Sequence, residues 1–264
     1  MDKPSRPTNL NDLALRIRSL KGQARRSSGR YLAEGLRLVE TAMQSGAEIE
    51  ELILSQGFER AHPGKAQAWR KHYIVSVVPD KLFTKLADTV TPQGVMSVLP
   101  QPAPDRERFT NARTLVILDN LRDPGNLGTI LRSAQATAVD GVVLSSGCVD
   151  AYSPKVVRSA MGAHFYVPLW QDASWEQIKE LCQLVPATLA DMHSGELYWQ
   201  ADWSAPTALI ISNEAFGASP EAAALASRTV HLPMLGNTES LNAAMAATVL
   251  LYEILRQRSQ ATAQ

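Results

Sequence analysis

The chain has 264 residues, 45% of them hydrophobic and 20% charged, and a formal net charge of zero. This length and composition allow one or two domains with their own cores and exclude a disordered, fibrous or disulfide-scaffold protein. Cys148 and Cys182 form no CxxC pair and no histidine completes a zinc site, so we expect no metal and a reducing compartment. With no membrane-spanning apolar segment and no signal-peptide core, we expect a cytoplasmic protein that does not contact a membrane.

Charge is distributed unevenly along the chain. Residues 1–30 carry eight basic and two acidic side chains, a net charge of +6, which the remaining residues balance. Such a segment in a neutral protein favours binding of a polyanion, although a solvated helix face explains it equally well. The candidate polyanion-binding side chains are Arg16, Arg18, Lys21, Arg25, Arg26 and Arg30.

The first part of the chain alternates between helical and strand patterns. Leu36, Val39 and Met43 recur at helical spacing and predict an amphipathic helix over residues 32–45. The other predicted elements are helices over residues 11–20 and 79–87 and strands over residues 49–54, 72–78 and 94–99. This pattern favours a small α/β domain. Three prolines within residues 100–105 indicate a linker, so we expect domains over residues 1–105 and 106–264.

The second part reads as repeated β-α units. Residues 114–119 form a continuous apolar run, typical of a strand that is buried on both faces of a parallel sheet. The other predicted strands are residues 141–144, 187–190, 207–211 and 229–232, and the predicted helices follow residue 125, start at 154, or cover 175–184 and 240–256. We therefore expect a parallel sheet covered by helices.

Common signatures of nucleotide and hydrolase chemistry are absent. The sequence has no G-x-x-x-x-G-K-[ST], no G-x-G-x-x-G after a strand and no H-E-x-x-H. Its five histidines are scattered, and no serine or cysteine lies in a nucleophile-elbow context. Kinase and hydrolase functions are therefore excluded.

Polar residues instead follow three predicted strands, at the edge where open α/β sheets bind ligands. These stretches are residues 119–132, 211–217 and 232–242. Singly, each has an ordinary explanation: Asn126 and Ser240 suit helix caps, and Glu214 suits a solvated turn. Arg132 alone would be a surface charge.

Together and in this order, the three stretches resemble the motifs of the SpoU/TrmH branch of the SPOUT RNA methyltransferases. Residues 118–134, LDNLRDPGNLGTILRSA, are similar to the first motif, residues 153–163 to the segment between motifs, and residues 230–256 to the third motif. The front half, including YLAEGLRLVETAMQSGAEIEELIL, resembles the family's substrate-binding domain. The resemblance covers about residues 10–257.

The resemblance implies an α/β fold: a C-terminal parallel-sheet SPOUT domain with a trefoil knot, preceded by a small RNA-binding domain similar to ribosomal proteins. It implies methylation of a ribose 2′-hydroxyl in RNA, with S-adenosylmethionine as the methyl donor. Ribosomal RNA is favoured over transfer RNA because the front domain is separate and resembles ribosomal proteins. The alternatives are a tRNA 2′-O-methyltransferase and a catalytically silent RNA-binding or assembly protein.

The resemblance also implies roles for individual residues. Asn126, Arg132 and Glu214 correspond to catalytic positions. A guanidinium is a poor base near neutral pH, so we expect Arg132 to grip a phosphate and stabilise the developing alkoxide. The implied cofactor-binding residues are Ser212, Asn213, Gly217, Leu232, Met234, Gly236, Ser240, Leu241 and Asn242. The six basic side chains of residues 1–30 are then candidates for RNA binding.

The second motif departs from the family pattern at two positions. Ser212 and Ala215 replace glycines of the family's second motif, which implies either a negative φ at these positions or side chains fitted beside the ligand.

The final predicted helix is apolar nearly all round, which a surface helix of a monomer would not be. We therefore expect a homodimer through the C-terminal domain.

Overall fold

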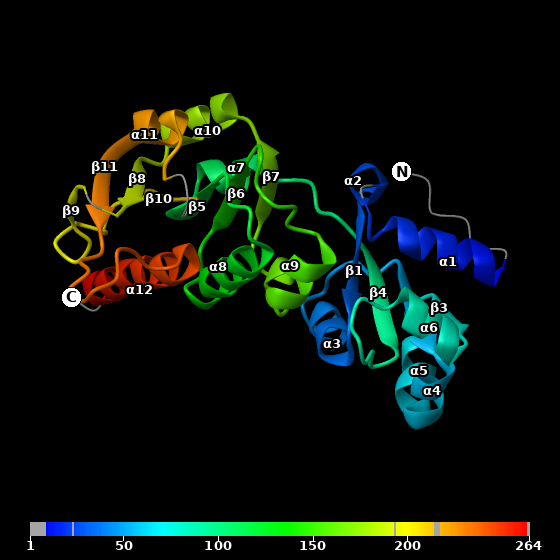
Figure 1. The fold of residues 1–264 in the computed structure, drawn as a ribbon. Coiled ribbons are helices and arrows are strands. Elements are labelled where there is room, and N and C mark those ends of the chain that lie inside the picture. Colours follow the sequence, from blue (N-terminus) through cyan, green and yellow to red (C-terminus); the bar gives the residue numbers. More distant parts are fainter. Residues whose placement is uncertain (1–8, 23, 193, 214–216, 263–264) are drawn as a thin grey trace. The chain divides into compact units, whose positions relative to one another are not determined.

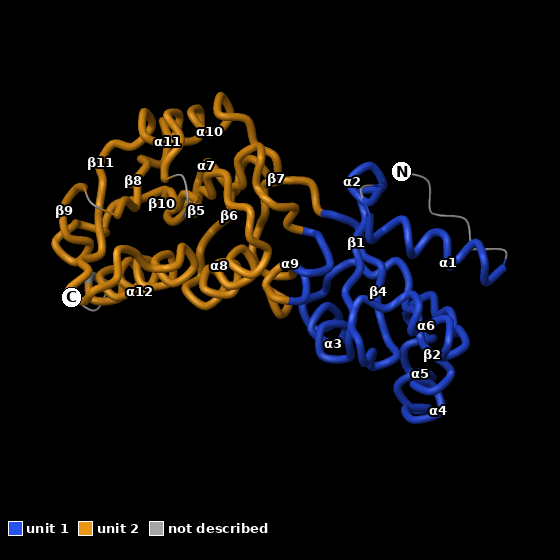
Figure 2. The backbone as a smooth tube through the Cα atoms, viewed as in Figure 1, with its two compact units in different colours: residues 1–101, 152–158 blue, residues 102–151, 159–264 orange. Residues whose placement is uncertain are grey.

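The computed structural model describes residues 9–22, 24–192, 194–213 and 217–262. The chain forms two compact units: residues 1–101 with 152–158, and residues 102–151 with 159–264 (Figure 2). The first unit thus includes a short segment from the middle of the sequence. In that unit the rings of Tyr31 and Tyr152 pack with their centroids 4.9 Å apart. Deleting residues 1–101 would therefore remove a packing partner of Tyr152.

The first unit contains a four-stranded sheet in the order β1-β4-β2-β3. Its strands are β1 (Arg30–Glu34), β2 (Glu51–Ser55), β3 (Val75–Val78) and β4 (Val95–Pro100). Only the β2–β3 pair is parallel. Its helices are α1 (Leu10–Ser19), α2 (Ala24–Ser28), α3 (Leu36–Gln44), α4 (Gln56–Ala61), α5 (Pro63–Trp69) and α6 (Asp80–Leu86). One apolar cluster contains side chains of α1 and α6, and another contains side chains of α3, α4 and α5, which confirms an α/β domain.

The predicted helix over residues 32–45 is wrong in its first turn. Tyr31, Leu32 and Ala33 are buried in strand β1, which pairs with β4. Gly35 has φ +106°, a conformation that interrupts regular structure and that side chains disfavour, and α3 begins only after it. Helices α2, α4 and α5 were not predicted.

The second unit contains a seven-stranded sheet in the order β7-β6-β5-β10-β8-β11-β9, and all neighbouring strands are parallel. The strands are β5 (Thr114–Asp119), β6 (Gly141–Ser145), β7 (Leu169–Ala173), β8 (Ala187–Asp191), β9 (Glu196–Leu197), β10 (Thr207–Ser212) and β11 (Ala226–His231). All six residues of β5 are buried, as its apolar run predicts. The predicted parallel sheet is confirmed, whereas the edge strands β7 and β9 were not predicted.

Helices cover both faces of this sheet. Figure 1 shows α8 (Pro124–Ala136) and α12 (Ala243–Thr262) on one face and α10 (Trp175–Cys182) and α11 (Pro220–Leu225) on the other. The second unit also contains the short helix α7 (Arg106–Thr110) and a 3₁₀ turn at Ala163–Phe165. Helix α9 (Pro154–Ser159) belongs to the first unit except for its last residue. None of the helices among the described residues is both long and apolar enough to cross a membrane.

Helix α12 has a buried side and an exposed apolar side. Leu250 and Ile254 are buried within the protomer. Met245, Val249 and Tyr252 are exposed, by 60%, 37% and 50% respectively. The apolar composition noted in the sequence is therefore explained by the core for one side of the helix only.

Candidate functional site

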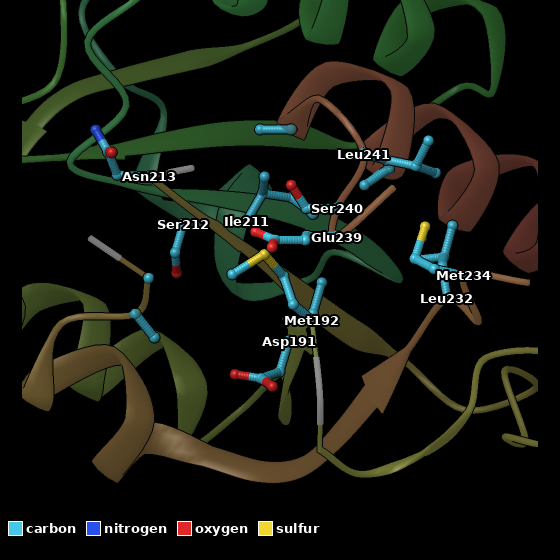
Figure 3. A pocket seen from close by; sticks show the side chains of 15 residues that line it. Asp191, Met192, Ile211, Ser212, Asn213, Leu232, Met234, Glu239, Ser240 and Leu241 are labelled. Carbon is cyan, nitrogen blue, oxygen red and sulfur yellow. The ribbon is translucent and has the colours of Figure 1, made fainter. Parts of the chain in front are cut away.

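A cleft lies at the carboxyl ends of β8, β10 and β11, beside the N-terminus of α12 (Figure 3). Its volume is about 680 Å³ including the open mouth. The strand ends meet here because neighbouring strands are parallel and the following loops diverge from the sheet edge. The lining residues are Ala190, Asp191, Met192, Ile211, Ser212, Asn213, Gly217, Ala218, Leu232, Met234, Glu239, Ser240, Leu241, Ala243 and Ala246.

The cleft brings together most of the residues that the resemblance assigns to the cofactor. They are Ser212, Asn213, Gly217, Leu232, Met234, Ser240 and Leu241. Gly236 and Asn242 do not line it. Glu214 and Ala215 lie outside the described residues, so the structure does not place this candidate catalytic carboxylate.

The cleft is also lined by Asp191, Met192 and Glu239, which were not predicted from the sequence. Asp191 is the last residue of β8, a parallel neighbour of β10. The rule that pointed to the ends of the other strands applies equally to this strand. Glu239 was not singled out in the sequence because the resemblance assigns roles to its neighbours Ser240, Leu241 and Asn242 and none to Glu239.

The chemistry of the lining is apolar and acidic. Ile211, Leu232 and Leu241 supply aliphatic surface, and Asp191 and Glu239 supply carboxylates. No lysine, arginine or histidine is among the described residues that line the cleft. Side chains of these types commonly neutralise phosphate groups, so the lining favours a partly apolar, cationic ligand over a phosphorylated nucleotide.

Ser212 faces the cleft with an unsatisfied hydroxyl. Its Oγ is buried and has no hydrogen-bond partner among the described residues. Its φ is not positive, so the backbone here does not require glycine. A buried hydroxyl without a partner costs free energy, which a ligand that hydrogen-bonds to it would recover.

Asn126 and Asn242 join the first and third motifs. Asn242 Nδ2 donates to Asn126 Oδ1 at 2.8 Å. Asn242 Oδ1 accepts from the backbone N–H groups of Ala244 and Met245, at 3.0 and 3.3 Å, and so caps α12. The structure thus orients the Asn126 amide through a residue that also fixes the start of α12.

The ordinary explanation of Asn126 and Ser240 as helix caps does not hold. Asp123, not Asn126, caps α8: its Oδ1 accepts from the backbone N–H of Asn126 at 2.7 Å. Asn242, not Ser240, caps α12, because that helix begins only at residue 243. Asn126 is therefore held inside the first turn of α8 and its side chain serves another purpose than capping.

Arg132 lies on α8, six residues after Asn126, with an exposed side chain. Its guanidinium has no ion pair or side-chain hydrogen bond with any described residue. It does not line the cleft. Within the described part of the chain, none of its N–H donors is used by a side-chain acceptor.

The loop that follows β10 is anchored on both sides of its undescribed part. Asn213 Nδ2 donates to the carbonyl oxygen of Asn120 at 3.0 Å. The buried Asp119 carboxylate accepts from the backbone N–H of Ser219 at 2.7 Å. Asp119 and Asn120, at the end of β5, thus bind Ser219 and Asn213 by hydrogen bonds that the sequence did not reveal.

The six basic candidates of residues 1–30 have different surroundings. Arg16 pairs with Glu51, and Arg30 Nε donates to Glu50 at 2.6 Å. Arg25 is only 4% exposed. Burial lowers the pKa of Lys21, against the opposing effect of Asp88 and Glu34.

Arg18 and Arg26 are the two of the six whose side chains are exposed. The structure thus does not present the six as one exposed surface. Most of the six side chains form a salt bridge or are at least partly buried within the first unit, because their neighbours in the fold are acidic or apolar.

Sequence profiles identify both parts of the chain. Residues 113–252 match the SpoU rRNA Methylase family, and residues 15–97 match the MRM3-like substrate binding domain. Among the described residues, no three His, Cys, Asp or Glu side chains are grouped so as to hold a metal ion.

Curated proteins and solved structures align along nearly the whole chain. The uncharacterised tRNA/rRNA methyltransferase slr1673 of Synechocystis is 34% identical, over 94% of this chain and 92% of its own. The Bacillus subtilis 23S rRNA (guanosine(2553)-2′-O)-methyltransferase RlmP is 34% identical, over 87% of this chain and 90% of its own. The SpoU methyltransferase AviRb from Streptomyces viridochromogenes, solved in complex with the cofactor AdoMet, superposes with a TM-score of 0.86 at 29% identity, covering 95% of this chain and 98% of its own.

Proposed function

Because the chain belongs to the SpoU rRNA Methylase family, we propose that it transfers the methyl group of S-adenosylmethionine to a ribose 2′-hydroxyl of ribosomal RNA. The observation that carries this proposal is the acidic and apolar cleft at the strand ends, where seven residues of the family's cofactor motifs converge. A relative of the same fold is solved with this cofactor, and named relatives methylate 23S rRNA.

The residues of the cleft suit this cofactor. S-adenosylmethionine supplies a methyl group on a positively charged sulfur. Leu232 and Leu241 offer apolar surface to its adenosine and methionine parts, and the Ser212 hydroxyl has no hydrogen-bond partner among the described residues and is assigned to the ligand. We also assign contact with the cofactor to Asn213, Gly217, Met234 and Ser240, which line the same cleft. To Asn242 we assign the orientation of Asn126 through their hydrogen bond.

The RNA side of the site rests on α8. Arg132 is exposed and pairs with none of the described residues, so we propose that its planar fork holds a phosphate beside the target ribose and stabilises negative charge on the attacking oxygen. The hydroxyl oxygen would use a lone pair to form the new C–O bond as the C–S bond of the methyl donor breaks, and the hydroxyl proton would pass to solvent water. Asn126 and Glu214 are proposed to orient the nucleotide and Arg132.

The separate first unit supports RNA as the substrate, since its sequence matches a substrate binding domain of an rRNA methyltransferase type. We propose Arg18 and Arg26 as its phosphate contacts and retain Arg16, Lys21, Arg25 and Arg30 only as secondary candidates. Transfer RNA is the second candidate substrate, because the Synechocystis relative is named a tRNA/rRNA methyltransferase.

We further propose a homodimer through the exposed apolar side of α12. This surface consists of Met245, Val249, Tyr252 and Leu255. Contiguous exposed apolar side chains on one helix are typical of an interface between subunits. The trefoil knot and a cytoplasmic location are proposed on the family resemblance and on the two free cysteines, respectively.

The test is methyl transfer from radiolabelled S-adenosylmethionine to unmodified ribosomal RNA and, separately, to bulk transfer RNA. Label in ribosomal RNA that leaves the adjacent phosphodiester resistant to alkali supports the proposal, since alkaline cleavage needs a free 2′-hydroxyl. Label in transfer RNA alone would replace the substrate. Cofactor binding without transfer to any RNA would favour a silent RNA-binding protein.

A further inference from the structure

Glu239 is one of the two carboxylates that make the described lining of the cleft acidic, and it has been assigned no role of its own. It lies three residues before the cap of α12, in the loop that follows β11, and lines the cleft. Figure 3 shows its carboxylate among the lining side chains, directed toward the side of the cleft that carries Ser212. Its charge is uncompensated, because the carboxylate has no ion pair or hydrogen bond with any described residue.

The other carboxylate of the lining is already engaged. Asp191 Oδ1 accepts from the backbone N–H of Ser194 at 2.9 Å, so it stabilises a local turn. Together the two carboxylates give the described lining a formal charge of −2, with no basic side chain to balance it. A cation in this cleft is therefore attracted more strongly than a neutral molecule of the same shape.

The reaction changes the charge of its cofactor by one unit. When the methyl group leaves, the electron pair of the broken C–S bond stays on the sulfur, and the positive sulfonium becomes a neutral thioether. The ammonium and carboxylate of the methionine part are the same in donor and product. The two molecules thus differ in charge only at the sulfur.

We propose that Glu239 makes the cleft discriminate by charge, holding S-adenosylmethionine more tightly than its product S-adenosylhomocysteine. This inference rests on the proposed function and adds a specificity-determining residue to it. The physical consequence is product release: the attraction that retains the donor disappears once the methyl group has been transferred. Because Glu239 is exposed, water and salt weaken the effect, and we expect a difference of about three- to fivefold rather than orders of magnitude.

The experiment measures dissociation constants by calorimetry for three ligands: S-adenosylmethionine, S-adenosylhomocysteine and sinefungin, which carries an amine at the methyl position. In Glu239→Gln, we expect affinity for the two cationic ligands to fall about three- to fivefold and affinity for the neutral product to change less than twofold. The matched control is Glu221→Gln, an exposed carboxylate in the first turn of α11 that does not line the cleft; it should leave all three affinities unchanged.

Salt gives a second reading on the same proteins. Raising the salt concentration should reduce the preference of the wild type for the cationic ligands more than it reduces that of Glu239→Gln, in which Asp191 is the one carboxylate left in the described lining. Equal weakening of all three ligands would overturn the proposal and assign Glu239 to a group that donor and product share. An unchanged Glu239→Gln would overturn it as well. A wild type that binds none of the three ligands would instead refute the proposed function.

Discussion

Gly128 provides a stringent test of how α8 is packed. A Cβ atom built at this position would lie 2.6 Å from Ser159 Cβ and 2.9 Å from the backbone nitrogen of Ala160. Both distances are shorter than atoms of these types tolerate, and the second involves backbone that cannot rotate away. Gly128→Ala must therefore displace α8 or residues 159–160.

Two opposing contributions determine the size of the effect. Overpacking of a close contact costs up to about 3 kcal/mol. Replacing glycine by alanine inside a helix returns about 1 kcal/mol. We therefore expect Gly128→Ala to lower the free energy of unfolding by about 2 kcal/mol, which corresponds to roughly 5 °C in melting temperature for a unit of this size.

The assay is urea and thermal unfolding followed by circular dichroism, with Gly64→Ala as the control. Gly64 lies in helix α5, and a Cβ there would meet nothing within 4 Å. Gly64→Ala should therefore be neutral or stabilising by about 0.5 kcal/mol. A Gly128→Ala protein as stable as the wild type would refute the close approach, and partial recovery in the Gly128→Ala, Ser159→Gly double variant would support it.

Four further predictions concern the site, the subunit interface, the RNA surface and pH. Arg132→Ala should abolish methyl transfer while leaving cofactor affinity within about threefold. Arg132→Lys should also be severely impaired because an ammonium cannot replace a planar guanidinium, and near-normal turnover of the lysine variant would contradict the phosphate-holding role of Arg132. Charged residues substituted at Met245 and Tyr252 should give monomers by light scattering, whereas charged residues at the buried Leu250 and Ile254 should unfold the protein. A wild-type protein that is itself monomeric would contradict the interface. The double variant Arg18→Ala, Arg26→Ala should reduce the slope of log RNA affinity against log salt concentration by about 1.4 for single-stranded RNA, and an unchanged slope would assign RNA binding elsewhere. Arg16→Ala and Arg25→Ala should instead lower the free energy of unfolding. Burial lowers the pKa of His164 from 6.5 to about 4, so between these pH values the unfolded chain takes up a proton that the native protein does not, and the free energy of unfolding should fall by up to about 3 kcal/mol as the pH decreases from 6.5 to 4. Urea unfolding across this range should show this dependence of the unfolding free energy on pH, and His164→Gln should remove the contribution of His164 to it.

Local patterns in the sequence were sufficient to predict the five strands β5, β6, β8, β10 and β11 of the second unit. The apolar run of β5 and the repeated β-α alternation predicted a parallel sheet, because strands buried on both faces must be continuously apolar. Since the carboxyl ends of parallel strands share one edge, the polar residues after β10 and β11 were expected to meet, and they line one cleft. The order of the three motifs carried the family resemblance.

Contacts between distant residues were decided only by the tertiary structure. The hydrogen bond between Asn126 and Asn242 joins residues 116 positions apart, and no local pattern specifies such a pairing. Arg16 and Arg30 appear in the sequence as part of a basic segment, yet Glu51 and Glu50 neutralise them because β2 folds beside that segment. Residues 32–34 fit a helix by their spacing but form a strand, since pairing with β4 satisfies their backbone groups. The periodicity of a sequence shows which face of a helix or strand is apolar, whereas the partner of that face depends on chain topology. The negative charge of the cleft likewise arises only because the fold brings the end of β8 and the loop after β11 together.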